Sequence, residues 1–340
     1  MDIGTTNTKV IAIDAQGDEI ALASNETIWH NKPGGRVEAI AEEIFQICLK
    51  TIYDVLEKAA NKHTEVKVGS LAITGLAESG VIVDNKGLAL TNPVAWFDAR
   101  GEQEMQALGD AFKLGFQSKT GLVFKAEASI STLLSFKSEG FDFKNKDIVW
   151  LNLQEYIAYR LTGVMASEPS LTSRTGLYDQ SNLSMWQGAI DALGISKDFV
   201  PRELIAGSEW GKINSTYFKP EILGASVTIA GHDHAVGAMG SGATQPDQIF
   251  NSTGTSDAII RTVPGKLSDA QRLELTTMGV SAGRHVLKDL SGCIGGSRGG
   301  LVLRRALDLL GARKGERFLE IDNAWVPNLN FKEVIDLTQH

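Results

Sequence analysis

The sequence has little of what would tie it to a disulfide scaffold, a polyanion or a membrane. Its 340 residues include only two cysteines, Cys48 and Cys293, too few for a disulfide framework or a thiolate metal site. Basic residues number 33 against 41 acidic ones, so the basic face of a nucleic-acid-binding protein is missing. Apolar runs stay well short of the roughly 20 residues of a membrane span. We therefore expect a cytoplasmic protein with neither a nucleic-acid nor a membrane partner.

Proline is also scarce, at 8 residues, whereas glycine reaches 35. The hydrophobic share of 43% and the charged share of 22% are ordinary for a globular chain, which excludes low-complexity and disordered classes. The length suits two domains. The glycines are then expected in turns and at close backbone approaches.

Hydrophobic periodicity predicts a layered α/β protein. The expected strands lie at 10–13, 19–23, 68–74, 81–83 and 226–230. The expected helices lie at 37–55, 147–161 and 186–193. The first two strands form a hairpin, and a hairpin followed by a helix and a further strand is typical of an α/β layer.

A domain boundary is expected near residue 225, which gives two domains over 1–225 and 226–340. The segment at 249–260 resembles the start of the chain, because each combines Gly-Thr-(Thr/Ser) with a β-branched strand. This weak internal repeat predicts two related domains that face each other across a cleft.

The first candidate for chemistry is the motif Asp2-x-Gly4-Thr5-Thr6-Asn7-x-Lys9. A glycine in a tight turn lets backbone N–H groups form an anion-binding nest, and threonine hydroxyls add donors. Asp2 suits a water-mediated contact to Mg²⁺, which prefers oxygen ligands. A plain Gly-Thr hairpin turn is the alternative interpretation.

A second candidate for phosphate binding is Gly254-Thr255-Ser256, and its support comes from its resemblance to the first motif. Alone it is a weak signal. Two phosphate-binding turns, one from each domain, are what a nucleoside triphosphate held in a cleft needs.

A third candidate, Asp233, lies just after an expected strand. A carboxylate there points into the crevice of an open α/β sheet, where it can accept the proton of a substrate hydroxyl that attacks a phosphoryl group. Metal ligation by His232 and His234 is a second interpretation, because alternate residues of an extended segment share one side. The sequence shows no third ligand for such a metal, and a structural role for both histidines is a third interpretation.

Glu78 follows an expected strand and a glycine, where it could accept hydrogen bonds from polyol hydroxyls. A solvated loop position is the alternative. In the segment from Trp96 to Arg100, Asp98 and Arg100 are either part of the same site or a structural ion pair, and Trp96 is either a ligand platform or a core residue.

Taken together, these segments resemble the FGGY family of carbohydrate kinases, which phosphorylate sugars and polyols from ATP. The similar segments are 2–9, 35–38, 92–100, 159–163, 173–179, 231–233 and 254–256. They cover essentially the whole chain, and their number and order exceed what chance agreement supplies.

The resemblance implies an α/β, actin-like (ribonuclease H-like) fold of two domains with the active site in the cleft between them, the second domain being incomplete. It implies ATP, Mg²⁺ and a small-molecule sugar or polyol, and it leaves a homodimer open. Asp233 is then the general base and Asp2 helps hold Mg²⁺. The two Gly-Thr turns bind the phosphates, together with Asn7 and Lys9, so that transfer depends mainly on positioning and charge stabilisation.

The resemblance also implies substrate contacts at Ala77, Glu78, Asp98, Arg100, Asp233 and His234. Here the sequence departs from individual branches of the family. Glu78 lies where glycerol kinases carry a Glu and xylulose kinases a His. Ala77 lies where glycerol kinases carry an Arg, and His234 where both branches carry an amide. We therefore expect a sugar or polyol without naming one.

Both ends differ from an intact member of that family. Only Met1 precedes Asp2, where the family has an apolar strand, so Asp2 is expected on a fraying end. After residue 310 we find no Gly-rich adenosine-binding segment, and the glycine cluster at 295–300 comes too early. We therefore expect a truncated kinase. An inactive fragment or a non-catalytic sugar-binding relic is the alternative, and an actin-like assembly ATPase is disfavoured by Glu78 and the segment 96–100.

Overall fold

The computed structural model describes residues 1–62, 65–215, 217–253, 257–297 and 299–312, together with 317, 319 and 320. Its helices are α1 (Ala41–Ala60), α2 (Glu102–Gln106), α3 (Gly109–Thr120), α4 (Ser129–Ser138), α5 (Leu153–Thr162), α6 (Pro169–Thr172), α7 (Gln187–Leu193), α8 (Asp233–Gly240), α9 (Asp269–Thr277) and α10 (Gly299–Leu309). Within these residues, none of the helices combines the length and the apolar character needed to cross a bilayer.

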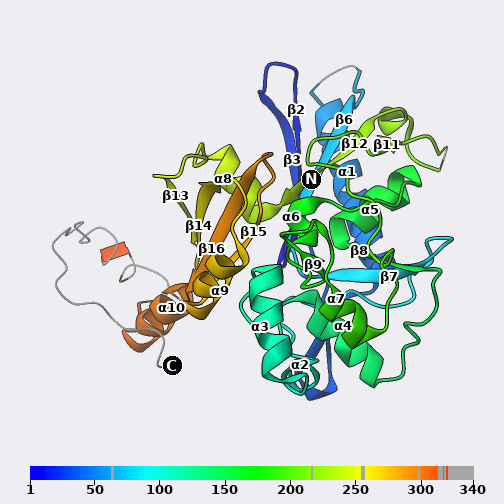
Figure 1. Cartoon of the computed structure of the whole chain (residues 1–340). Coiled ribbons are helices and arrows are strands. Elements are labelled where there is room, and N and C mark those ends of the chain that lie inside the picture. Colours follow the sequence, from blue (N-terminus) through cyan, green and yellow to red (C-terminus); the bar gives the residue numbers. More distant parts are fainter. Residues whose placement is uncertain are drawn as a thin grey trace.

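The N-terminal unit contains a six-stranded sheet, whose strands lie in the upper part of Figure 1. Its spatial order is β11-β12-β6-β1-β2-β3, from β1 (Asp2–Ile3), β2 (Asn7–Ile13), β3 (Glu19–Glu26), β6 (Ser70–Gly75), β11 (Gly211–Lys212) and β12 (Ser226–His232). The hairpin of β2 and β3 confirms the one predicted from the sequence. Since β1 and β12 both run parallel to β6, their carboxyl ends meet at one edge of the sheet.

An antiparallel ribbon of β7 (Gly80–Asp84) and β8 (Ile148–Asn152) serves two hydrophobic cores. Val81 and Val83 pack in the core that the six-stranded sheet shares with α1 and α5, whereas Ile82 packs in a second core with residues of α2, α3, α4 and α7. Because side chains alternate across a strand, one ribbon can join both cores.

The helix expected over 147–161 is wrong in its first half. Ile148–Asn152 is the strand β8, and α5 begins only at Leu153. A capping box marks this start, since the Asn152 backbone N–H donates to Glu155 Oε2 at 2.7 Å. Gly163, with φ 79°, ends the helix where the sequence predicts.

The helix expected over 37–55 also begins late, at Ala41. Residues before it form β5 (Arg36–Glu38), paired with β4 (His30–Lys32). The helical spacing of apolar residues continues into this strand, so spacing alone does not distinguish the strand from the helix that follows it. The short helix α7 and its ribbon, β9 (Tyr178–Asp179) with β10 (Ser184–Met185), complete the unit.

The expected division at 225/226 falls inside one sheet. β12 pairs in parallel with β6 from Ser226↔Ser70 to His232↔Gly75, so the N-terminal unit extends at least to His232. Parallel pairing joins strands that are distant in sequence, and the local pattern around residue 226 carries no sign of it.

A second, four-stranded antiparallel sheet follows, in the order β13-β14-β16-β15. Its strands are β13 (Ile249–Thr253), β14 (Asp257–Pro264), β15 (Val280–Arg284) and β16 (Leu290–Ser297). Figure 1 shows this sheet to one side of the larger unit, together with α9 and α10. The motif Gly254-Thr255-Ser256 falls between β13 and β14 and lies outside the described residues.

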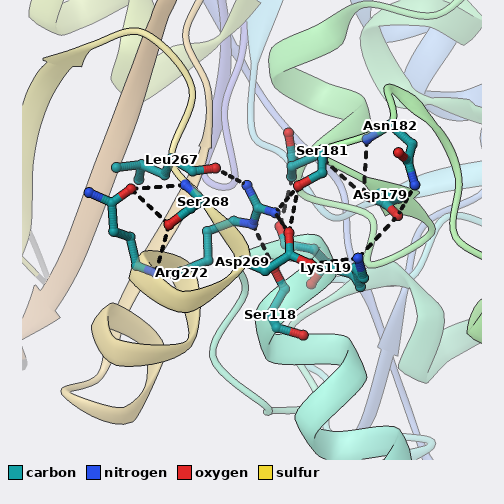
Figure 2. A network of polar contacts seen from close by, with 12 residues as sticks. Ser118, Lys119, Asp179, Ser181, Asn182, Leu267, Ser268, Asp269 and Arg272 are labelled. Atoms are coloured by element: carbon teal, nitrogen blue, oxygen red, sulfur yellow. Dashed lines mark hydrogen bonds and ion pairs between the residues drawn. The ribbon is translucent and has the colours of Figure 1, made fainter.

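A polar network around Arg272 of α9 joins the two units (Figure 2). Arg272 is 2% exposed, and its guanidinium donates to the Ser118 carbonyl and to Ser181 Oγ, both at 2.6 Å. In the same network, Asp269 of α9 pairs with Lys119 of α3 at 2.5 Å. The second unit is therefore docked on the first through one buried arginine and one partly exposed ion pair.

Strand β15 extends this interface. The backbone N–H of Ala282 donates to the Gly121 carbonyl at 2.7 Å. Arg284 Nη1 lies 2.6 Å from each carboxylate oxygen of Glu203. Both contacts join the edge of the second sheet to the N-terminal unit.

Candidate active site

The turn between β1 and β2 contains the first candidate phosphate motif. The Gly4 N–H donates to the Asn7 carbonyl at 3.1 Å, which leaves little room for a side chain at position 4, because a Cβ there would lie 2.9 Å from that oxygen. Thr27 Oγ1 donates to the Gly4 carbonyl at 2.9 Å, and Trp29 Nε1 donates to the Thr5 carbonyl at 2.8 Å. Hydrogen bonds from Thr27 and Trp29 thus hold the turn in place.

Trp96 supports the same turn from the segment 96–100. Its Nε1 donates to Thr5 Oγ1 at 3.0 Å, and its half-buried ring stands perpendicular to Phe97 at 5.5 Å. Thr6 and Lys9 are exposed. The sequence did not indicate this link, because the two segments are far apart in the chain.

Asp2 lies in the middle of the six-stranded sheet, between β2 and β6. Its backbone is therefore paired on both sides, which differs from the fraying end expected from the sequence. Its Oδ1 is buried and has no hydrogen-bond partner within the described ranges. Burial raises the pKa of Asp2, and the negative charge of Asp233 adds to the rise.

Asp233 is the first residue of α8 and follows β12 directly. Its side chain is 31% exposed, and its Oδ1 accepts from the His234 N–H at 2.7 Å and lies 3.2 Å from His232 Nε2. Burial holds the pKa of His232 well below its usual range. Gly231 has φ +110°, and a Cβ there would meet Val286 and Ser170, so only glycine fits where the strand enters this site.

Glu78 lies in the loop after β6, in the left-handed region at φ 66°. Its Oε1 lies 2.6 Å from Arg174 Nε and 2.5 Å from Arg174 Nη2, and the two side chains are 10% and 15% exposed. Burial raises the pKa of Glu78, the Arg174 charge opposes the rise, and the Asp233 charge adds to it. Ala77 beside it is buried.

Three carboxylates gather where the parallel strands end. Ile3 of β1 and His232 of β12 both pair with Gly75 of β6, so the ends of the three strands are level. Asp2, Glu78 and Asp233 come from these strands or from the residues that follow them. This edge is where open α/β sheets bind their ligands.

Asp98 and Arg100 form the structural ion pair that the sequence offered as an alternative. Arg100 Nη2 lies 2.9 Å from Asp98 Oδ2, and the side chains are 4% and 2% exposed. Asp98 also accepts from the Val37 N–H at 2.6 Å, and Arg100 lies 3.3 Å from Glu38. Hydrogen bonding to Arg100 and to the backbone outweighs burial and lowers the pKa of Asp98. Among the described residues, no polar contact joins this pair to the three carboxylates.

Arg174 is the site residue that the sequence did not single out. It belongs to the segment 173–179, which is part of the family resemblance but did not point to a catalytic or binding role for any of its residues. A buried Glu78 needs a cationic partner. The only indication of Arg174 in the sequence was therefore that some basic residue had to lie beside Glu78. The sequence could not show which of its basic residues supplies it.

Comparisons with known proteins identify the family of this chain. A model for the N-terminal domain of the FGGY family of carbohydrate kinases matches residues 1–240, well over half of the chain. The chain belongs to the FGGY family of carbohydrate kinases. This confirms the resemblance inferred from the sequence.

The FGGY chain is 25% identical over 300 residues to a glycerol kinase of Thermococcus gammatolerans, covering 86% of this chain and 59% of the relative. It therefore spans less than two thirds of that relative. Its structure matches a ligand-bound xylulose kinase from Lactobacillus acidophilus, with a TM-score of 0.81, 22% identity and coverage of 95% and 64% of the two chains. A Plasmodium falciparum glycerol kinase with ADP gives a TM-score of 0.80, 19% identity and coverage of 90% and 62%. These likenesses confirm the expected actin-like α/β fold.

Proposed function

We propose that this chain carries the acceptor site of an ATP-dependent kinase that phosphorylates a hydroxyl of a sugar or polyol. The observation that carries the proposal is the level edge of β1, β6 and β12, where Asp2, Glu78 and Asp233 converge beside the Gly4 turn. Membership of the FGGY family and the glycerol and xylulose kinases among its relatives and neighbours support the substrate class.

In the proposed reaction, Asp233 acts as the general base. Its carboxylate takes the proton of the substrate hydroxyl while that oxygen forms a bond to the γ-phosphorus of ATP. The bond from the γ-phosphorus to the bridging oxygen breaks, and ADP leaves with that electron pair. A side chain 31% exposed, at the end of a rigid strand, is both reachable and fixed.

Glu78 is proposed to orient the acceptor. Arg174 contacts only Oε1, and no described residue donates to Oε2, which is left to accept from a substrate hydroxyl. We keep Ala77 and His234 as lining residues, and Asp98 and Arg100 as supports of the segment that holds Trp96.

The backbone N–H groups and hydroxyls of the Gly4–Thr6 turn are proposed to bind phosphate oxygens, with Asn7, Lys9 and the Gly254-Thr255-Ser256 motif. Asp2 suits Mg²⁺, because a buried carboxylate oxygen without a partner needs a cation or water. When bound there, Mg²⁺ supplies charge neutralisation for the transferring phosphoryl group.

We also propose a reducing, cytoplasmic location, which the two free thiols support. The test of the proposed function is a panel of sugars and polyols, including glycerol and xylulose, screened for binding by saturation-transfer NMR and for MgATP-dependent phosphorylation by ³¹P NMR. A bound member that gains a phosphate supports the kinase. Binding without phosphate transfer instead supports the sugar-binding relic, and a panel without any bound member overturns both.

A further inference from the structure

Three consecutive side chains meet where β12 joins α8. One ligand atom each from His232, Asp233 and His234 lies within 4.8 Å of the other two. The two imidazole rings are 5.2 Å apart and nearly perpendicular, at 89°. We propose that these three residues form a transition-metal site that takes Zn²⁺ or an ion of the same class.

The turn of the chain brings the three ligands together. In a continuous strand, His232 and His234 would share one side while Asp233 pointed to the other. Here the strand ends at His232 and the helix begins at Asp233, so the carboxylate joins the imidazoles. This is the third ligand that the extended pattern in the sequence did not reveal.

The spacing is close to that of a bound ion. Bonds of about 2.0–2.2 Å to one Zn²⁺ put ligand atoms roughly 3–4 Å apart. His232 Nε2 and Asp233 Oδ1 are already 3.2 Å apart, so the main adjustment left is rotation of His234. Its ring makes no hydrogen bond to the described residues, which leaves it able to turn.

The donor set selects the class of metal. Two imidazoles and one carboxylate suit Zn²⁺ and its transition-metal neighbours, with a position left open for water or substrate. Mg²⁺ demands oxygen ligands in octahedral geometry, so it competes poorly for two ring nitrogens. Nearby charge also favours a cation: Asp2 is unpaired at one oxygen, while the Arg174 charge is matched by Glu78.

The site is both anchored and accessible. His232 is 5% exposed, and its backbone N–H donates to Ser170 Oγ at 2.9 Å, which fixes the inner ligand. Asp233 and His234 are half-buried and reach the surface. An ion can therefore enter from solvent and meet a fixed imidazole.

One consequence rests on the proposed kinase function. A transition metal that holds the Asp233 carboxylate removes the base that would accept the hydroxyl proton. Zn²⁺ should then inhibit phosphorylation while Mg²⁺ supports it, and a chelator should restore activity. Metal binding itself does not depend on the reaction.

The test is calorimetric titration of the chain with Zn²⁺ in the presence of excess Mg²⁺, repeated with Co²⁺ to record its visible absorption. We expect one Zn²⁺ per chain, and affinity at least about tenfold lower in His234→Gln. His30→Gln is the matched control, because His30 is a half-exposed surface histidine paired with Glu43 at 2.6 Å. It should bind Zn²⁺ as the unchanged chain does.

Asp233→Asn provides a second ligand variant, and circular dichroism checks that each variant is folded. Unchanged Zn²⁺ affinity in a folded His234→Gln or Asp233→Asn overturns the site, as does displacement of Zn²⁺ by an equal concentration of Mg²⁺. Absent Zn²⁺ binding in a chain that still phosphorylates a polyol overturns the metal site alone. Intact Zn²⁺ binding with no polyol bound or phosphorylated overturns the kinase proposal alone.

Discussion

In the candidate active site, two nitrogens of Arg174 contact Oε1 of Glu78: Nε at 2.6 Å and Nη2 at 2.5 Å. Both side chains are largely buried, at 15% and 10% exposure. A buried carboxylate without its cationic partner strongly destabilises the folded state. The pair therefore holds Glu78 in place even though its backbone has the unfavourable φ of 66°.

Arg174→Met is expected to lower the free energy of unfolding by about 3–5 kcal/mol, because it leaves the Glu78 charge buried and unpaired. Urea unfolding measures the change. The control is Arg36→Met, which removes an exposed pair to Glu139 with 43% and 42% exposure and should cost about 0–1 kcal/mol. Equal costs for the two variants would show that the Glu78 pair is solvated after all.

Gly231→Ala should destabilise the chain by about 2–5 kcal/mol, since it combines a strained φ with overpacking. A Cβ there would meet Val286 and would lie 2.6 Å from Ser170 Oγ. Gly240→Ala is the matched control: nothing lies within 4 Å of its added Cβ, and it should be neutral or gain about 0.4–1 kcal/mol. Thermal unfolding ranks the two, and a harmless Gly231→Ala would contradict the close approach.

Arg272→Met should loosen the second unit from the first, at a cost of about 2–4 kcal/mol. The buried guanidinium joins α9 to Ser118 and Ser181, and methionine replaces its volume but not its hydrogen bonds. Limited proteolysis should then cut between the units. Lys266→Met, at an exposed position of the same region, should leave the digestion pattern unchanged. Identical patterns for both variants would argue against the network in Figure 2 as the joint.

Cys48 should resist thiol reagents in the folded chain. It is 1% exposed, and burial raises its pKa to about 12, so at about pH 8 only ~0.01% of it is thiolate. Raising the pH toward 10 should still leave it largely protonated. Labelling of a Cys293→Ser variant follows Cys48 alone, and it should become rapid only in denaturant. Rapid labelling of the folded variant at about pH 8 would contradict the burial.

The positions of several candidate site residues could be predicted from the sequence, because they depend on local signals. The hairpin at 10–23, the glycine turn at Gly4 and the carboxylate after a strand at Asp233 each depend on a few neighbouring residues. Family resemblance joined them into one proposed reaction. The local structure of these parts is determined by the residues of their own turns.

The rest depended on contacts between distant segments. Ile148–Asn152 has an apolar spacing that suits either helix or strand, and only its pairing with β7 decides. β12 joins the N-terminal sheet through β6, which no pattern near residue 226 indicates. Likewise, nothing local to Glu78 says that Arg174 completes its ion pair.

In the proposed reaction, Asp233 accepts the proton of the substrate hydroxyl. The most direct measurement compares Asp233→Asn with the unchanged chain, for MgATP-dependent phosphorylation and for binding of the same polyol. Loss of the base should lower turnover by about 10²–10⁴-fold while the dissociation constant of the polyol stays within a few-fold. Turnover that survives the substitution would contradict the assignment.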